Sequence, residues 1–238
     1  MGDELGRETR GAAVVLTLRR EERRNALSFT LLEALQEALA RAAEDPAVAV
    51  VCLTGAGEKA FCAGLDLAEL ATPGDPAPRV AQAYAAVLQR MLGFPKPLVA
   101  RVGGPCLAGG VGLVLCCHLS LARADVYFSL PELDLGVFPM MVAGLLERRV
   151  GPAAAMDWVL TGRRIPAEEA AARGLVTRAV PAALLDSEVD DLLSLLAGRG
   201  PDAVCAGFQA LRETRSLPAS AALEPLLHAL GRTLSSGT

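Results

Sequence analysis

The chain has 238 residues, which is enough for one large domain or two small ones with an ordinary hydrophobic core. Hydrophobic residues make up 52% and charged residues 21%, which excludes a disordered chain, and no apolar run reaches the roughly 18 residues of a membrane span. The formal net charge is −4, so we expect neither nucleic acid nor an anionic membrane as a partner.

The first residues and the cysteines indicate the compartment. Met1-Gly2-Asp3-Glu4 carries acid where a signal or transit peptide would carry base, so we expect a cytoplasmic protein. The six cysteines lie mostly in apolar segments and lack paired C-x-x-C spacing. We expect them to be reduced core residues and expect no metal site.

The N-terminal part of the chain alternates between strand-like and helix-like patterns. Thr30 and Glu33 have the spacing of a capping box at the start of one helix, and residues 48–54 are a nearly uninterrupted apolar run, which favours a strand buried on both faces. In chain order we expect a strand over 12–18, a helix over 28–43, a strand over 48–54, a helix over 79–92, a strand over 98–102, a loop opening into a buried helix over 106–115, and strands over 118–122 and 126–128.

The composition changes past Pro139 to alanine, leucine, arginine and glutamate at helical spacing, broken by glycines and prolines. This pattern predicts a mainly helical C-terminal part. Alternating strands and helices followed by helices indicate one α/β core with a helical appendage.

A weak nucleotide-binding signal follows the strand expected over 48–54. Residues 55–60, Gly-Ala-Gly-Glu-Lys-Ala, match the G-x-G-x-x-A fingerprint of dinucleotide-binding folds. The fingerprint requires a helix to begin at these glycines, whereas Phe61-Cys62-Ala63-Gly64 continues as loop. The alternative, a plain turn at the exit of the strand, fits better.

Two glycine-bearing loops carry the stronger functional signal. Residues 60–66 and 107–112 each follow a buried strand, and Pro131-Glu132 comes further on. Two turns with exposed N–H groups can form an oxyanion hole, and a neighbouring carboxylate can supply a base.

Four ordered motifs carry a family resemblance. They are Arg24-Asn25-Ala26-Leu27, Ala60-Phe61-Cys62-Ala63-Gly64-Leu65-Asp66-Leu67, Ala108-Gly109-Gly110 and Pro131-Glu132-Leu133-Asp134-Leu135-Gly136. In order and spacing they resemble the crotonase superfamily of enoyl-CoA hydratases and isomerases. The resemblance implies an α/β fold in which a spiral of ββα repeats (residues 1–180) precedes a C-terminal helical trimerisation region (181–238), with the family's final segment missing after it. It also implies a homotrimer, or a hexamer made of two trimers.

The resemblance further implies the site residues. The backbone N–H groups of Leu65 and Gly109 would bind the thioester oxygen of an acyl-CoA, and Glu132 would move a proton at the acyl chain. Coenzyme A is part of the substrate, so no separate cofactor is expected. Contacts with the substrate and its coenzyme A are implied for Ala26, Ala63, Asp66, Leu67 and Gly110.

This sequence departs from the family pattern at three positions. The second glutamate of the hydratases is replaced by Gly112, Ala68 stands where many relatives have a lysine near the nucleotide, and His118 stands where an aspartate is usual. Lys59 and Lys96 are the only lysines, so we expect arginines to bind any phosphates of coenzyme A. We expect His118 to be a core residue.

One carboxylate can carry a proton between two carbons but is less able to orient water alone. The missing glutamate therefore slightly favours Δ3–Δ2 enoyl-CoA isomerisation over hydration of a 2-enoyl-CoA. Two alternatives stay open: a non-catalytic CoA-binding or assembly homologue, and a thioester hydrolase or decarboxylase that uses the same oxyanion hole.

Overall fold

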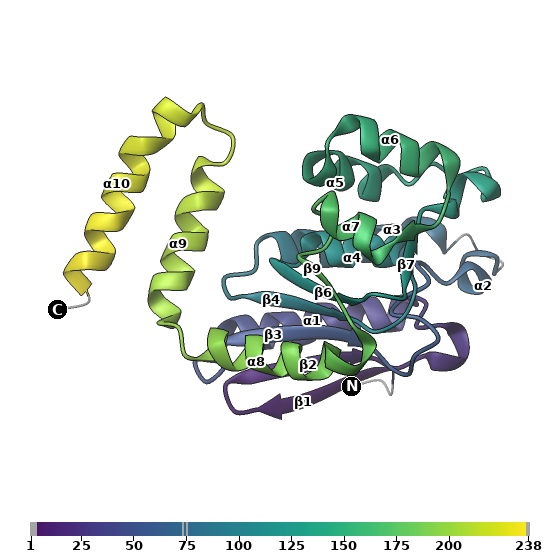
Figure 1. The fold of residues 1–238 in the computed structure, drawn as a ribbon, viewed down its shortest axis with the longest axis horizontal. Helices are drawn as coiled ribbons and strands as arrows, with labels where there is room; N and C mark the ends of the chain where they lie inside the picture. The colour runs from purple at the N-terminus through teal and green to yellow at the C-terminus, as the bar shows by residue number, and fades with distance from the viewer. Residues whose placement is uncertain (1–3, 73, 75, 237–238) are drawn as a thin grey trace.

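A six-stranded sheet forms the centre of the computed structural model (Figure 1), which describes residues 4–72, 74 and 76–236. The strand order is β1-β2-β3-β4-β6-β9, and every neighbouring pair is parallel except β1 with β2. The strands are β1 (Leu5–Arg10), β2 (Ala13–Leu18), β3 (Val50–Gly55), β4 (Leu98–Val102), β6 (Leu119–Arg123) and β9 (Arg178–Val180). The parallel order confirms the alternating α/β pattern.

A second, three-stranded sheet contains β5 (Cys106–Leu107), β7 (Tyr127–Ser129) and β8 (Ile165–Pro166). In it β5 pairs parallel with β7, and β7 pairs antiparallel with β8. This small sheet matters for the site because β5 leads directly into a buried helix and β7 leads to Glu132.

The large sheet is covered on both faces. On one face lie α1 (Phe29–Glu44), α3 (Ala77–Leu92) and α4 (Gly109–Cys116), and on the other lies α8 (Leu185–Ala197). Along β3, Val51 and Leu53 belong to the first core cluster, whereas Val50 and Cys52 pack with α8 in the second. The two-sided burial predicted for this strand is confirmed.

The start of α1 differs in detail from the expected capping box. The N-cap is Ser28, whose Oγ accepts a hydrogen bond from the Leu31 N–H at 3.0 Å, so the predicted cap at Thr30 is wrong. The helix ends against a buried lysine: Lys96 Nζ donates to the Ala42 and Asp45 carbonyl oxygens at 2.8 and 2.7 Å. Both ends of the helix are thus satisfied by side chains.

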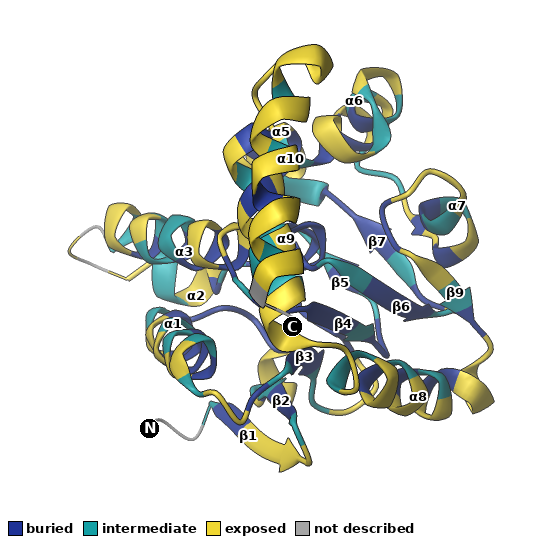
Figure 2. Cartoon of the chain, turned by 90° about the vertical axis from the view of Figure 1, so that its left-hand side faces the viewer, coloured by how far each residue is buried: buried dark blue, intermediate teal, exposed yellow. Residues whose placement is uncertain are grey.

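The chain past Pro139 is mainly helical, as predicted, although the short strands β8 and β9 interrupt it. Of its helices, α9 (Pro201–Thr214) and α10 (Ala219–Ser236) extend away from the sheet as a hairpin (Figure 1), with much of their surface exposed (Figure 2). The remaining helices are α2 (Leu67–Leu70), α5 (Met140–Val150), α6 (Pro152–Thr161) and α7 (Ala167–Ala172), and short 3-10 turns cover Glu21–Arg23, Pro131–Leu135 and Ala182–Leu184.

None of the described helices offers an apolar stretch long enough to span a bilayer. The first three residues, on which the expected location partly depends, lie outside the described residues. The cytoplasmic location stays a prediction.

The middle of α9 is held to the core by His118, which is half-buried. Its ring stacks on Phe208 of α9 with 4.2 Å between ring centroids, and its Nδ1 accepts a hydrogen bond from the Leu98 N–H at 3.0 Å. Burial, reinforced by the charges of Arg149, Arg212 and Arg215, lowers the pKa of His118 to about 4. The structural role expected for this histidine is confirmed.

Acid should weaken this attachment. In the unfolded chain His118 takes up a proton near its ordinary pKa of 6.5, whereas the native protein resists protonation until about pH 4, so native stability should fall as the pH drops through this window. Chemical denaturation at several pH values checks this. His118→Asn should flatten the pH dependence over the window, and the matched change His228→Asn, on an exposed part of α10, should keep the wild-type slope. Equal slopes in all three proteins would contradict the assignment.

Candidate active site

Three chain segments run side by side and end at one place. Cys62 pairs with Cys106 in a parallel bridge, and the Leu107 N–H donates to the Cys62 carbonyl oxygen at 2.9 Å. On the other side β5 pairs with β7, and the Ala108 N–H donates to the Ser129 carbonyl oxygen at 2.9 Å. Continuing the first register places Leu65 beside Gly109, and Glu132 follows three residues after Ser129.

The first two segments touch at Gly64. A Cβ atom built on Gly64 would lie 2.6 Å from the Ala108 Cβ and 3.1 Å from the Gly109 nitrogen, and Gly64 has a φ of +92°. A side chain at this position would therefore clash and would also strain the backbone. The bare Cα of Gly64 is what lets the two loops approach.

The amides of Leu65 and Gly109 remain available at this contact. Gly64 and Asp66 are both hydrogen-bonded to Leu27, through the Leu27 N–H to the Gly64 oxygen at 2.8 Å and the Asp66 N–H to the Leu27 oxygen at 3.0 Å. This parallel pairing turns the intervening Leu65 N–H to the opposite side. Within the described residues, neither the Leu65 N–H nor the Gly109 N–H donates a hydrogen bond.

The turn into α4 is strained. Ala108 has φ 51° and ψ −125°, a conformation that an L-amino acid rarely adopts. The following residue, Gly109, is the first of α4, so its free N–H lies at the positive end of the helix dipole. The strained backbone thus places an N–H group that donates no hydrogen bond among the described residues at the N-terminus of α4.

Glu132 is the candidate acid–base group. It lies in the 3-10 turn Pro131–Leu135, and its Oε2 is buried with no hydrogen-bond partner among the described residues. Burial raises the pKa of Glu132 above its ordinary value, partly offset by its own backbone N–H. A buried carboxyl oxygen without a partner is costly unless a ligand engages it, which is typical of an active-site base.

The remaining predicted contact residues surround the loop of Leu65. Ala26 is buried, and its carbonyl oxygen accepts from Arg20 Nη1 at 2.7 Å, while the Ala63 N–H donates to the Arg24 oxygen at 3.1 Å. Leu67 is exposed. These residues thus lie in and around the segment that carries Leu65, held by local hydrogen bonds.

Asp66 and Gly110 have structural partners of their own. Asp66 caps α2 by accepting from the Ala68 N–H at 3.0 Å, and its other oxygen pairs with Arg20 Nη2 at 2.8 Å. Burial alone would raise the pKa of Asp66, yet the hydrogen bond and charge of Arg20 hold it below its ordinary value. Gly110 packs on Cys62, since a Cβ there would lie 2.8 Å from the Cys62 Cβ.

Sequence reasoning gave no role to two buried residues that hold the site. Asn25, with φ +54°, donates from Nδ2 to the carbonyl oxygens of Ala56 and Ala60 at 3.0 and 2.8 Å. Tyr84 of α3 donates from its hydroxyl to the Gly109 oxygen at 2.7 Å. Asn25 lay inside a recognised motif, whereas a lone tyrosine in an alanine-rich helix gives no signal by itself.

The dinucleotide interpretation fails on geometry. β3 ends at Gly55, and no α-helix begins after it until α2 at Leu67 in the described chain. The glycines of residues 55–60 therefore do not present a helix N-terminus to a phosphate. The alternative reading, a turn at the exit of the strand, is confirmed.

The cysteines do not form a reactive centre. All except Cys205 are buried, all are free thiols, and burial raises the pKa of Cys62 to about 12. Among the described residues no group of three histidine, cysteine or acidic side chains is placed to hold a metal ion.

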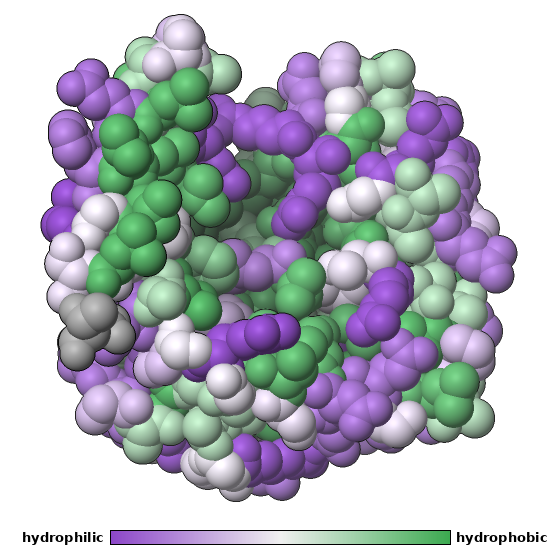
Figure 3. Space-filling model, turned by 60° about the vertical axis from the view of Figure 1, so that its left-hand side comes forward, coloured by the Kyte–Doolittle hydropathy of each residue, from purple (hydrophilic) through white to green (hydrophobic). Residues whose placement is uncertain are grey.

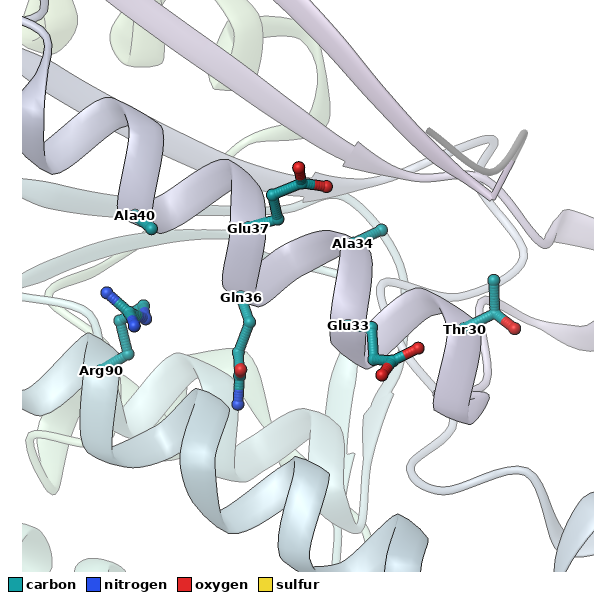
Figure 4. Close-up of a pocket in the computed structure, with 7 residues that line it drawn as sticks. All are labelled: Thr30, Glu33, Ala34, Gln36, Glu37, Ala40 and Arg90. Atoms are coloured by element: carbon teal, nitrogen blue, oxygen red, sulfur yellow. The ribbon is translucent and has the colours of Figure 1, made fainter.

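A separate surface groove lies between α1 and α3 (Figure 4). Its lining is largely polar and includes Glu33, Gln36, Glu37 and Arg90, with none of the residues of the two loops and not Glu132. We therefore assign the site to the loops rather than to this groove.

Comparisons with known proteins point the same way. The family described as enoyl-CoA hydratase/isomerase matches residues 8–235. A putative enoyl-CoA hydratase of Thermus thermophilus is 38% identical over 81% of this chain and 77% of its own, and the 2,3-dehydroadipyl-CoA hydratase of Escherichia coli is 37% identical over 88% and 82%. The crystal structure of an enoyl-CoA hydratase from Mycobacterium smegmatis superposes with a TM-score of 0.93 at 31% identity, covering 98% of this chain and 91% of that one.

The contact at Gly64 can be tested by adding one methyl group. Gly64→Ala should lower the free energy of unfolding by about 1–3 kcal/mol, because the methyl group overlaps Ala108 and the φ of +92° disfavours alanine. Gly144→Ala is the matched control: no atom lies within 4 Å of its Cβ position on α5, so it should stabilise by about 0.5–1 kcal/mol. Urea unfolding measures both, and a neutral Gly64→Ala would refute the close approach.

Proposed function

The chain belongs to the enoyl-CoA hydratase/isomerase family, which acts on acyl-CoA thioesters, and from that membership we propose that it shifts the double bond of a 3-enoyl-CoA to the 2-position. Its structural neighbours are enoyl-CoA hydratases, which confirms the crotonase-like fold. The observation that carries the proposal is the buried oxygen of Glu132 that lacks a partner among the described residues, together with two amides, on Leu65 and Gly109, that donate no hydrogen bond there.

In the proposed mechanism Glu132 acts as the single proton carrier. Its carboxylate removes a proton from C2 of the 3-enoyl thioester, and the electrons of the broken C–H bond spread over C2, C4 and the thioester oxygen. The same carboxyl group then returns the proton to C4, which leaves the double bond between C2 and C3. The net reaction moves one hydrogen and needs no water or co-reactant.

The amides of Leu65 and Gly109 stabilise the dienolate. Negative charge builds on the thioester oxygen as the C2 proton leaves, and two fixed N–H donors meet that charge without reorganising. The side chain of Leu65 is unimportant for this role because only its amide is used. Gly109 adds the positive end of the α4 dipole.

The missing second acid supports isomerisation. A carboxylate at position 112 would share water with Glu132, but the residue is glycine, and a Cβ there would overlap the Tyr84 hydroxyl. Asp134 is exposed, and the carboxylate of Asp66 is committed to Arg20 and the cap of α2. Proton transfer along the chain requires only the one acid that this site provides.

Hydration of a 2-enoyl-CoA is the second candidate, because the T. thermophilus and E. coli relatives are named as hydratases. Two further alternatives give distinct products. A thioester hydrolase would release free CoA and a decarboxylase carbon dioxide, whereas a non-catalytic homologue would bind acyl-CoA and turn over none of these substrates.

We place coenzyme A beside Ala26, Ala63, Asp66, Leu67 and Gly110, as part of the substrate rather than as a separate cofactor. The exposed Arg23 and Arg24 adjoin Ala26, which supports phosphate binding by arginine where relatives use lysine.

We also propose that residues 181–238 join subunits into a trimer or a pair of trimers. Large apolar side chains are exposed along α9 and α10, including Leu211, Leu223, Leu227, Leu230 and Leu234. Figure 3 shows apolar side chains gathered in a stripe along one side of the molecule, and exposed apolar patches are typical of interaction surfaces. A partner subunit would remove this stripe from water.

The role of Glu132 can be measured directly. Glu132→Gln should lower kcat for a 3-enoyl-CoA by about 10²–10⁴-fold, since the amide cannot accept the C2 proton. The control Asp134→Asn, an exposed acid in the same 3-10 turn, should change kcat by less than about twofold. Product analysis separates isomerisation from hydration, and unchanged turnover in Glu132→Gln would remove this residue from the mechanism.

The same substitution should raise stability at neutral pH. An unfolded Glu132 releases its proton near pH 4.5, while the native carboxyl holds it to higher pH, so this group costs stability as the pH rises above 4.5. Glu132→Gln should therefore unfold at a higher temperature than the wild type at neutral pH, and the gain should vanish below pH 4.5. A neutral-pH loss of stability in the variant would argue against a buried, partnerless carboxylate.

A further inference from the structure

Tyr84 occupies a notch made by two glycines of α4. Gly109 and Gly112 are three residues apart, so they lie on the same face of the helix. A Cβ on Gly109 would lie 3.3 Å from the Tyr84 Cζ, and a Cβ on Gly112 would overlap the Tyr84 hydroxyl oxygen. The phenol ring therefore fills the volume that side chains at these positions would need.

The phenol is fixed in this notch. Tyr84 is only 2% exposed, and its hydroxyl donates to the Gly109 carbonyl oxygen at 2.7 Å. The first turn of α5 closes the other side, because Val142 Cγ2 lies 3.3 Å from the same Cβ position of Gly112. The residue that carries one proposed oxyanion amide is thus held through its carbonyl group by Tyr84.

The charge of Glu132 also acts on this phenol. Burial raises the pKa of Tyr84 well above its ordinary value, and the charge of Glu132 is among the further causes, after the neighbouring thiols. The phenol stays protonated and keeps donating to Gly109. Its hydroxyl hydrogen is therefore committed to the protein and is not offered to a water molecule.

We propose that Tyr84 is a specificity-determining and positioning residue, which holds the first turn of α4 and excludes the water that hydration would require. This inference rests on the proposed function, since it explains why the site would favour proton transfer within the acyl chain. Addition of water requires a second polar group that holds the water opposite Glu132. Tyr84 fills the place from which position 112 would supply such a group.

The first test compares two reactions in the same protein. Wild type, Tyr84→Phe and Tyr84→Leu are assayed with 3-hexenoyl-CoA for isomerisation and with crotonyl-CoA for addition of water. Exchange of the C2 protons of butyryl-CoA with deuterated solvent, followed by NMR, reports enolate formation independently of either reaction. The matched control is Tyr127→Phe, since Tyr127 is the other tyrosine of the chain and lies on β7.

Each variant has a distinct expected result. Tyr84→Phe keeps the ring but loses the bond to Gly109, so kcat for isomerisation and the exchange rate should both fall about fivefold with KM nearly unchanged. Tyr84→Leu vacates the notch, so the ratio of water addition to isomerisation should rise at least about tenfold. A purely structural role would lower both reactions equally, and Tyr127→Phe should match the wild type.

The packing itself is tested without activity. Gly112→Ala should destabilise the wild type more than it destabilises Tyr84→Phe, because the phenylalanine lacks the oxygen that the new methyl group would overlap. Thermal unfolding of the four proteins in this cycle measures the coupling. It also keeps the inference falsifiable if Tyr84→Leu does not fold.

The outcomes separate the two hypotheses. If the wild type exchanges C2 protons and isomerises but Tyr84→Leu leaves the reaction ratio unchanged, the inference about Tyr84 is wrong while the proposed function stands. If the effects of Gly112→Ala and Tyr84→Phe on stability simply add, Tyr84 does not fill the space beside Gly112, and the inference is likewise wrong. A wild type that neither exchanges C2 protons nor isomerises would overturn the proposed function and the inference with it.

Discussion

The parallel pairing of Phe61 and Cys62 with residues 105–107 is the interaction on which the site depends. The Phe61 N–H donates to the Pro105 oxygen and the Leu107 N–H to the Cys62 oxygen, each at 2.9 Å, so the register of the two loops is set before they leave the core. Main-chain hydrogen bonds set this register, and the amides of Leu65 and Gly109 follow from it. The identity of a side chain matters mainly where the two loops approach closely, as at Gly64.

Around this pairing, several polar side chains hold the backbone of the loops and helix starts in place. Asn25 ties the turn after β3, Arg20 and Asp66 tie the start of α2, and Tyr84 ties the start of α4. Glu132 is the exception, because its buried oxygen has no partner in the described chain. The supporting side chains have hydrogen-bond partners, whereas the acid does not. This difference distinguishes residues that hold the structure from the residue that we propose reacts with substrate.

The sequence alone predicted those helices and strands whose pattern of apolar residues lies within the element itself. The apolar run of β3 and the leucine spacing of α1 reveal their environment directly, and the ordered motifs located Leu65, Gly109 and Glu132. It missed β1, whose residues Leu5–Arg10 are mostly polar and whose last four are exposed at the sheet edge. It also missed the role of Tyr84, because that role arises from contact between α3 and α4, 25 residues apart at the hydrogen bond, which no spacing rule encodes.

The contact between Gly64 and Ala108 has a consequence for how such sequences diverge. One position must be bare and has a positive φ, while the other carries a methyl group on an equally unusual backbone. The gap between the loops has room for only one methyl group, so the identities of residues 64 and 108 are coupled. A methyl group added at position 64 would clash unless the methyl group of Ala108 were removed. The φ of +92° at position 64 would remain after such an exchange, so Ala108→Gly is expected to recover only part of the stability that Gly64→Ala loses.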